Sequence, residues 1–206
     1  MTADVPSGLR ERKKRQTRAA ILAAAGELFE ARGYEHVTVA EIADAANISV
    51  KTLFTYFRSK EDLAFADEHR LRDQLVAAIK SRPAGSSPVQ AVAALLDRLV
   101  DEGGETGLAE YHRGYGSSDA LASRLRRMWE SYEEAVAGAL AAEVSGPFAG
   151  PSARLTAAML VAMVRSFTWP EVLAEAQAQP SPRAARERLR AWVATAAPLV
   201  SCLGQH

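Results

Sequence analysis

Residues 21–63 read ILAAAGELFEARGYEHVTVAEIADAANISVKTLFTYFRSKEDL, and the helix signals in this stretch decide the fold. Apolar residues recur every three or four positions and predict an amphipathic helix over about residues 12–31. Gly33 follows as its C-terminal cap, because glycine readily adopts the left-handed conformation. Thr38 and Glu41 have the spacing of a capping box, so we expect a second, short helix to begin there.

The residues that follow predict a tight turn and a third helix. Asn47 tolerates the left-handed conformation, and Ser49 can cap a helix from Val50 to about Phe57 with Leu53 facing inward. Two short helices joined by a three-residue turn behind a longer helix are typical of a helix-turn-helix. An ordinary helical hairpin has the same spacing and stays an alternative.

The outward positions of this third helix suit contact with DNA. They are Val50, Lys51, Thr52, Thr55 and Tyr56. Lys51 can reach a phosphate or a guanine edge, Thr52 can offer a hydrogen bond or a methyl group, and Tyr56 can donate to a phosphate. These residue types therefore favour a nucleic-acid interface.

This stretch resembles the DNA-binding domain of the TetR (tetracycline-repressor) family of bacterial transcription regulators. The matching features are A-x-x-L-F-x-x-x-G-Y/F, T-V-x-x-I-A, and a helix ending aromatic-x-Y-F followed by x-S-K-E-x-L, within about residues 15–65. The resemblance implies phosphate contacts from Thr38, Tyr56 and Lys60, and base reading by Val50, Lys51 and Thr52. Phe54 stands where the family often has Tyr, so a hydroxyl contact is missing there, and stacking on a sugar or a thymine methyl stays open.

The chain as a whole is predicted to be all-α. Forty-one of its 206 residues are Ala, the strongest helix former, and no segment alternates β-branched and polar residues as a strand does. We expect a three-helix DNA-binding domain over residues 10–65 and a helical bundle for ligand binding and dimerisation over residues 66–206. A long fourth helix, from Lys60 to about Lys80, is expected to join them and to transmit the effect of a ligand.

The second domain carries the residues of a mainly apolar pocket. An aromatic stripe at helical spacing is more often plain core, so the pocket is a hypothesis beside that alternative. The candidates are Leu99, Tyr111, Tyr115, Leu125, Met128, Trp129, Tyr132, Met163 and Phe167. Such a pocket favours a small hydrophobic or aromatic effector, although Arg113 beside His112 suits a carboxylate.

The last two predicted helices, over about residues 151–169 and 183–203, are more apolar than one side of a protomer core requires. The resemblance implies that they pair across a two-fold axis in a homodimer. The residues expected at that interface are Ala157, Leu160, Val161, Val164, Leu189, Trp192, Val193, Ala196 and Val200. A fully intramolecular core is the alternative.

Charge and composition limit the other functions. The formal net charge is zero, but residues 1–60 hold ten basic and seven acidic residues, including a basic arm from Arg10 to Arg18. This asymmetry suggests a polyanion contacted at one end. We find no catalytic motif and no metal-ligand or cofactor-binding pattern, and the single cysteine, Cys202, agrees with a reducing compartment. We expect a cytoplasmic protein that is not an enzyme and does not enter a membrane.

These inferences combine into one functional hypothesis. The chain is predicted to be a ligand-responsive, homodimeric repressor that binds a near-palindromic double-stranded DNA operator and is released by a small hydrophobic effector. One alternative is a DNA-binding regulator whose second domain binds a protein partner and no small ligand. Another is a helical-bundle enzyme with an attached DNA-binding module.

Overall fold

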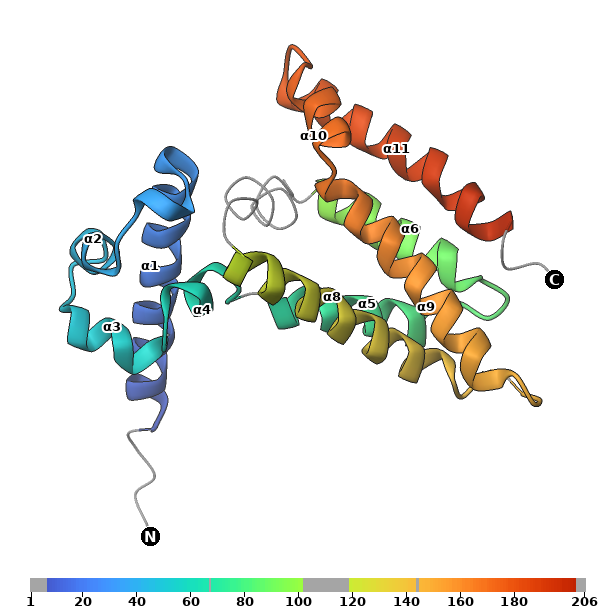
Figure 1. Ribbon diagram of the computed structural model, residues 1–206, viewed down its shortest axis with the longest axis horizontal. Coiled ribbons are helices and arrows are strands. Elements are labelled where there is room, and N and C mark those ends of the chain that lie inside the picture. Colours follow the sequence, from blue (N-terminus) through green and yellow to red (C-terminus); the bar gives the residue numbers. More distant parts are fainter. Residues whose placement is uncertain (1–6, 67, 102–118, 144, 203–206) are drawn as a thin grey trace, which may run out of the picture. The chain divides into compact units, whose positions relative to one another are not determined.

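The computed structural model describes residues 7–66, 68–101, 119–143 and 145–202, and these residues form helices and turns without a strand (Figure 1). The all-α prediction is confirmed. The described chain forms two compact units, residues 7–66 and residues 68–101 with 119–202. Each unit is described by itself below.

The first unit contains the helices of the stretch that opens the sequence analysis. They are α1 (Ser7–Arg32), the 3-10 helix η1 (Tyr34–His36), α2 (Val39–Ala45), α3 (Val50–Tyr56) and α4 (Lys60–Ala64). Ile21 of α1, Ile42 of α2 and Leu53 of α3 are fully buried and meet in one core cluster. Because α2 and α3 are too short to be stable alone, this shared core holds them in place.

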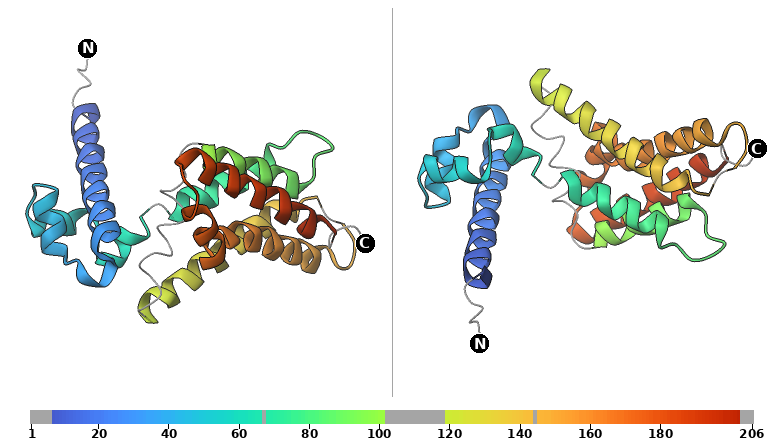
Figure 2. Two further views of the ribbon diagram at one scale, coloured as in Figure 1. Left: turned by 90° about the horizontal axis from the view of Figure 1, so that it is seen from above. Right: turned by 90° about the horizontal axis from the view of Figure 1, so that it is seen from below.

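The second unit is a bundle of longer helices. They are α5 (Glu68–Lys80), α6 (Pro88–Asp101), α8 (Asp119–Leu140), α9 (Ala149–Arg165), η2 (Ser166–Thr168), α10 (Pro170–Gln177) and α11 (Pro182–Cys202). Helix α8 packs against α5 and α9, and α11 packs against α6, α9 and α10 (Figure 2). The core of this unit is formed by the buried side chains of these packed helices.

The predicted long fourth helix is wrong. Helix α4 ends at Ala64, and Phe65 leaves the helical conformation with φ −107° and ψ 20°. Helix α5 begins afresh at Glu68. Each piece has apolar residues at helical spacing, so periodicity could not reveal the break between them.

The structure also corrects the region before the last helix. The helix predicted to end near Trp169 stops at Arg165, η2 follows, and α10 was not predicted at all. Pro170 occupies the first turn of α10, a position that tolerates its missing N–H. This proline was the signal for a separate helix start.

Six residues predicted for the dimer interface are buried within the protomer. They are Ala157, Leu160, Val161 and Val164 of α9 and Val193 and Ala196 of α11. Side chains that the protomer already covers leave little surface for a second chain, and their contact with a partner stays a prediction. Leu189, Trp192 and Val200 are half-buried, and their contact with a partner stays a prediction.

No single described helix is long and apolar enough to cross a membrane. Residues 149–168 and 170–177 meet the length and composition criteria only as a pair, and they are bent by 45° at Trp169.

Candidate functional site

Helix α3 is held by its inward side chains and by its N-terminal cap. Leu53 is fully buried and Phe57 nearly so, which fixes the helix on the core of the first unit. Asn47 adopts the left-handed conformation with φ 53°, as the sequence predicts. The Ser49 hydroxyl accepts the Thr52 N–H at 3.1 Å, so the predicted cap is confirmed.

The outer face of α3 presents a mixed apolar and basic surface. Val50 and Phe54 are separated by one helical turn, and Phe54 keeps 49% of its surface exposed. Lys51 is exposed beside them. A short polar helix does not need an exposed phenyl ring for its own stability, whereas a thymine methyl group offers that ring a partner.

The hydroxyl of Thr52 is less available than the sequence suggests. It lies 2.8 Å from the Ser49 hydroxyl, and Thr52 is only half exposed. Thr55 donates its hydroxyl to the Thr52 carbonyl at 2.6 Å. Tyr56 is likewise half exposed. The DNA contacts of Thr52 and Tyr56 stay predictions.

The capping box at the start of α2 is confirmed and is reinforced by an arginine. The Thr38 N–H and hydroxyl both donate to Glu41 Oε2, at 2.8 and 2.7 Å. Arg32 donates to Glu41 Oε1 at 2.7 Å and to the His36 carbonyl at 2.7 Å. The backbone hydrogen bond from Thr38, followed by the Arg32 contact, lowers the pKa of Glu41 to about 2. A phosphate contact from Thr38 stays a prediction and requires one of these protons to turn away from Glu41.

Lys60 has a structural role that the sequence does not reveal. Its ammonium group donates to the carbonyl oxygens of Tyr34 at 2.8 Å and Val37 at 3.0 Å. It also lies 3.9 Å from the centroid of the Tyr34 ring. These contacts tie the start of α4 to the turn before α2. The phosphate contact predicted for Lys60 must use the one remaining ammonium proton.

A basic stretch of α1 extends beyond the core of the first unit. Residues 8–16 are exposed, and the first turn of α1 contains no acidic residue. Arg10, Lys14 and Arg18 recur at intervals of four, so they form a stripe along one face. Arg18 ends this stripe beside α3, with its guanidinium carbon 5.1 Å from the centroid of the Phe57 ring.

The interior of the second unit contains most of the predicted ligand residues. Met128, Trp129, Tyr132, Met163 and Phe167 are buried, whereas Leu99 and Leu125 are half-buried; Tyr111 and Tyr115 lie outside the described residues, as do His112 and Arg113. Whether these side chains line one pocket stays a prediction.

A buried polar cluster joins α5 to α8 and was missed in the sequence. Glu68 keeps only 7% of its surface exposed, and Arg124 donates to its Oε1 at 2.6 Å. The Tyr132 hydroxyl donates to the Glu68 carbonyl oxygen. Burial, followed by the nearby Glu68 carboxylate, raises the pKa of Tyr132 well above its usual range, so its hydroxyl stays protonated. Glu68 shares the inward face of Leu71 and Leu75, which was the available signal.

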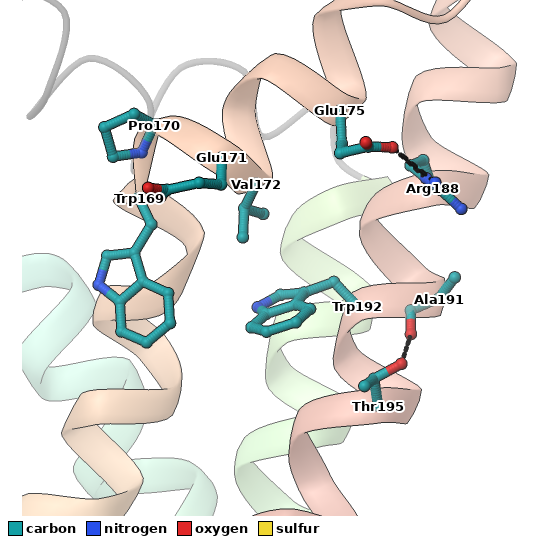
Figure 3. A pocket seen from close by; sticks show the side chains of 9 residues that line it. All are labelled: Trp169, Pro170, Glu171, Val172, Glu175, Arg188, Ala191, Trp192 and Thr195. Atoms are coloured by element: carbon teal, nitrogen blue, oxygen red, sulfur yellow. Dashed lines mark hydrogen bonds and ion pairs between the residues drawn. The ribbon is translucent and has the colours of Figure 1, made fainter.

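A groove of about 750 Å³ lies between α10 and α11, outside the predicted pocket (Figure 3). The rings of Trp169 and Trp192 form two of its walls, with centroids 6.3 Å apart. Trp192 donates its indole N–H to Ser166 Oγ at 2.8 Å. An ion pair between Arg188 and Glu175 closes one rim at 2.5 Å. Among the described residues, none of those predicted for ligand binding lines this groove.

The outer faces of α9 and α11 expose large apolar side chains. Leu155 of α9 is 64% exposed and Leu199 of α11 is 63% exposed. Ala191 and Thr195 precede Leu199 at intervals of four and also line the groove. A contiguous apolar surface marks a protein interface, whereas single exposed apolar residues are common, so an interface that includes these two leucines is a proposal. Within the described residues, no three His, Cys, Asp or Glu side chains are placed to hold a metal ion.

The comparisons with known sequences agree with the geometry of the first unit. The family model described as bacterial regulatory proteins, tetR family, matches residues 21–66. A curated relative, the HTH-type transcriptional regulator TcmR of Streptomyces glaucescens, is 43% identical over 98 residues. That match covers 46% of this chain and 43% of TcmR, so the chain matches less than half of the relative's length.

Solved structures resemble the whole described fold. Salmonella enterica GusR matches with a TM-score of 0.63 at 18% identity, over 93% of this chain and 96% of its own. FadR of Bacillus subtilis, solved in complex with stearoyl-CoA, matches with a TM-score of 0.60 at 18% identity, over 91% and 99%. NalD, the secondary repressor of the MexAB-OprM multidrug efflux pump in Pseudomonas aeruginosa, matches with a TM-score of 0.57 at 18% identity, over 88% and 97%. At these identities the likeness shows the fold.

Proposed function

We propose that this chain, whose helix-turn-helix domain is that of the TetR family of bacterial regulatory proteins, is a ligand-responsive repressor of transcription. One observation carries the proposal: α3 is fixed from within by Leu53 while it exposes Val50, Lys51 and Phe54 on one outer face. A helix presented in this way fits the major groove of DNA. The partial match to TcmR, an HTH-type transcriptional regulator, supports the same function.

In this function α3 reads base edges and the surrounding cations hold phosphates. Lys51 supplies a long, flexible donor for a guanine edge or a phosphate. Val50 and Phe54 supply apolar contact for thymine methyl groups, which replaces the hydroxyl contact that a tyrosine at position 54 would make. The basic stripe of α1 adds attraction for the phosphate backbone that does not depend on base sequence.

The functional form is a homodimer on a near-palindromic operator. Two-fold symmetry places two recognition helices about 34–36 Å apart on one face of DNA. The described surface supports an interface centred on Leu155 of α9 and Leu199 of α11, rather than on the buried residues that the sequence favoured. Covering two exposed leucines in each protomer supplies apolar area that the protomer alone leaves in water.

The effector acts through the second unit. A ligand that binds about 1–3 kcal/mol better to the conformation unable to bind DNA lowers operator affinity about five- to 150-fold. Helix α5 begins at Glu68, two residues after the first unit ends at Ala66. We therefore assign a part in transmitting the ligand's effect to α5. FadR, a structure with the same fold that was solved in complex with stearoyl-CoA, supports the proposal that the fold can hold a small molecule.

Selection of an operator from random DNA, followed by mobility-shift titration, tests this function. Lys51→Gln and Phe54→Ala should each weaken binding to the selected site by about tenfold, since one good contact to a base edge is worth about 1–3 kcal/mol. Phe54→Ala should also alter the preferred base, because the ring makes the apolar contact. Arg127→Gln, an exposed change in the second unit, is the matched control. Failure to enrich any sequence contradicts the proposal.

A further inference from the structure

The polar cluster between α5 and α8 contains one buried donor and one buried acceptor without partners. Within the described part of the chain, neither Trp129 Nε1 nor Glu68 Oε2 has a hydrogen-bond partner. Trp129 is 4% exposed and Glu68 is 7% exposed, so water does not freely replace the missing partners. Buried polar groups in native proteins are nearly always satisfied, and an exception requires a reason.

The two orphan atoms belong to one structural cluster. The Trp129 ring lies edge-on to Tyr132, with centroids 5.3 Å apart, and the Tyr132 hydroxyl donates to the Glu68 backbone carbonyl. Arg124 holds Glu68 Oε1, which leaves Oε2 as the open acceptor. Helices α5 and α8 are packed together, so this constellation is fixed by the bundle rather than by loops.

We propose that Trp129 Nε1 and Glu68 Oε2 are the polar anchors for the effector, and that the effector is a neutral, hydroxyl-bearing apolar molecule. The inference rests on the proposed function and specifies the ligand's chemistry. The indole N–H requires an acceptor on the ligand, and the carboxylate oxygen requires a donor; a hydroxyl group supplies both. A carboxylate ligand is disfavoured, because an ionised carboxylate has no proton to donate to Glu68 Oε2.

The position of Glu68 gives this contact a route to DNA binding. Glu68 is the first residue of α5, the element that follows the helix-turn-helix unit in the chain. A donor that satisfies Oε2 therefore changes the interactions of the residue from which α5 starts. An apolar ligand without hydrogen-bonding groups fills space but leaves both orphan atoms unsatisfied.

Three neutral probes of similar shape test the assignment. They are 2-naphthol, which donates and accepts, 2-methoxynaphthalene, which only accepts, and 2-methylnaphthalene, which does neither. Calorimetric titration of the full chain should rank their affinities in that order, with about a two- to tenfold step for each hydrogen bond. Trp129→Phe should remove the advantage of 2-methoxynaphthalene over 2-methylnaphthalene.

Glu68→Gln provides the complementary variant. The Arg124 donor keeps the amide oxygen facing it, so the amide NH₂ takes the place of Oε2 and the orphan acceptor becomes a donor. The variant should lose the preference for 2-naphthol over 2-methoxynaphthalene. Trp192→Phe is the control for loss of an indole, because the Trp192 N–H already has Ser166 as its partner.

The melting temperature in the presence of a probe is a second readout. A saturating concentration of 2-naphthol should raise the melting temperature of the wild type and of Trp192→Phe by more than that of Trp129→Phe, since only Trp129→Phe removes the donor that faces the ligand. The assignment is overturned if the wild type binds none of the probes, binds all three equally, or keeps its ranking in both variants. These measurements do not involve DNA, so a failure of the ligand assignment can be distinguished from a failure of operator binding.

Discussion

The ammonium group of Lys60 donates to the backbone carbonyl of Tyr34 at 2.8 Å and lies 3.9 Å from the centroid of the same residue's ring. The Lys60 side chain thus contacts both the backbone and the aromatic ring of Tyr34, in the turn that precedes α2. Helix α2 packs against α3, so by holding the turn before α2 the lysine also helps to hold the recognition helix α3 in place. A residue that resembles a phosphate ligand in sequence has a structural role in the fold.

Replacing Lys60 should therefore reduce stability as well as DNA binding. Lys60→Met removes two charge-assisted hydrogen bonds, and we expect the free energy of unfolding to fall by about 1.5–3 kcal/mol. Denaturant titration of the full chain measures this change. Lys51→Met, at an exposed site on α3, should change stability by less than about 0.5 kcal/mol. Equal stabilities of the two variants would assign Lys60 to DNA contact alone.

The basic stripe of α1 should appear in the salt dependence of DNA binding. Each phosphate contact contributes about −0.9 to the slope of log affinity against log salt, so Arg10→Gln with Lys14→Gln should reduce the slope by up to about 1.8 for each protomer, or about 3.6 for the dimer. The effect should be equal on operator and random DNA, since phosphates carry no base sequence. Lys80→Gln with Arg127→Gln is a charge-matched control in the second unit. An unchanged slope would exclude the stripe from the interface.

The dimer face should respond differently from the core beneath it. Leu155→Glu with Leu199→Glu places charges on the exposed faces of α9 and α11, and we expect a folded monomer with sharply reduced operator affinity. Val164→Glu buries an unpaired charge and should instead destabilise the protomer by about 3–5 kcal/mol. Sedimentation separates the first outcome and calorimetric melting the second. A Leu155/Leu199 variant that remains dimeric would place the interface elsewhere.

Acid should weaken the first unit through Glu41. Its pKa falls from 4.5 to about 2 in the folded chain, so the ionised carboxylate stabilises the fold. This contribution is fully present above pH 4.5 and is lost as the pH falls from 4.5 toward about 2. Glu41→Gln should flatten the decline in stability over that interval, whereas Glu35→Gln, an exposed control, should leave it intact. Identical pH profiles for the wild type and Glu41→Gln would contradict the capping-box ion pair.

The sequence determined the structures that depend on neighbouring residues. The capping box of Thr38 and Glu41, the left-handed Asn47 and the Ser49 cap each form within four residues. Their hydrogen bonds are local, so a single sequence contains the information needed to place α2 and α3. The inward direction of Leu53 follows from helical periodicity in the same way.

Only the tertiary structure decided which apolar side chains are available to a partner or ligand. Helices α9 and α11 have apolar residues on several faces, so spacing alone could not distinguish fully buried Val164 from Leu155, which is 64% exposed. Glu68 is buried where Arg124 and Tyr132, more than fifty residues away in the chain, donate to its carboxylate and to its backbone carbonyl. Burial depends on elements distant in sequence, and a periodic pattern gives the direction of a side chain but not what covers it.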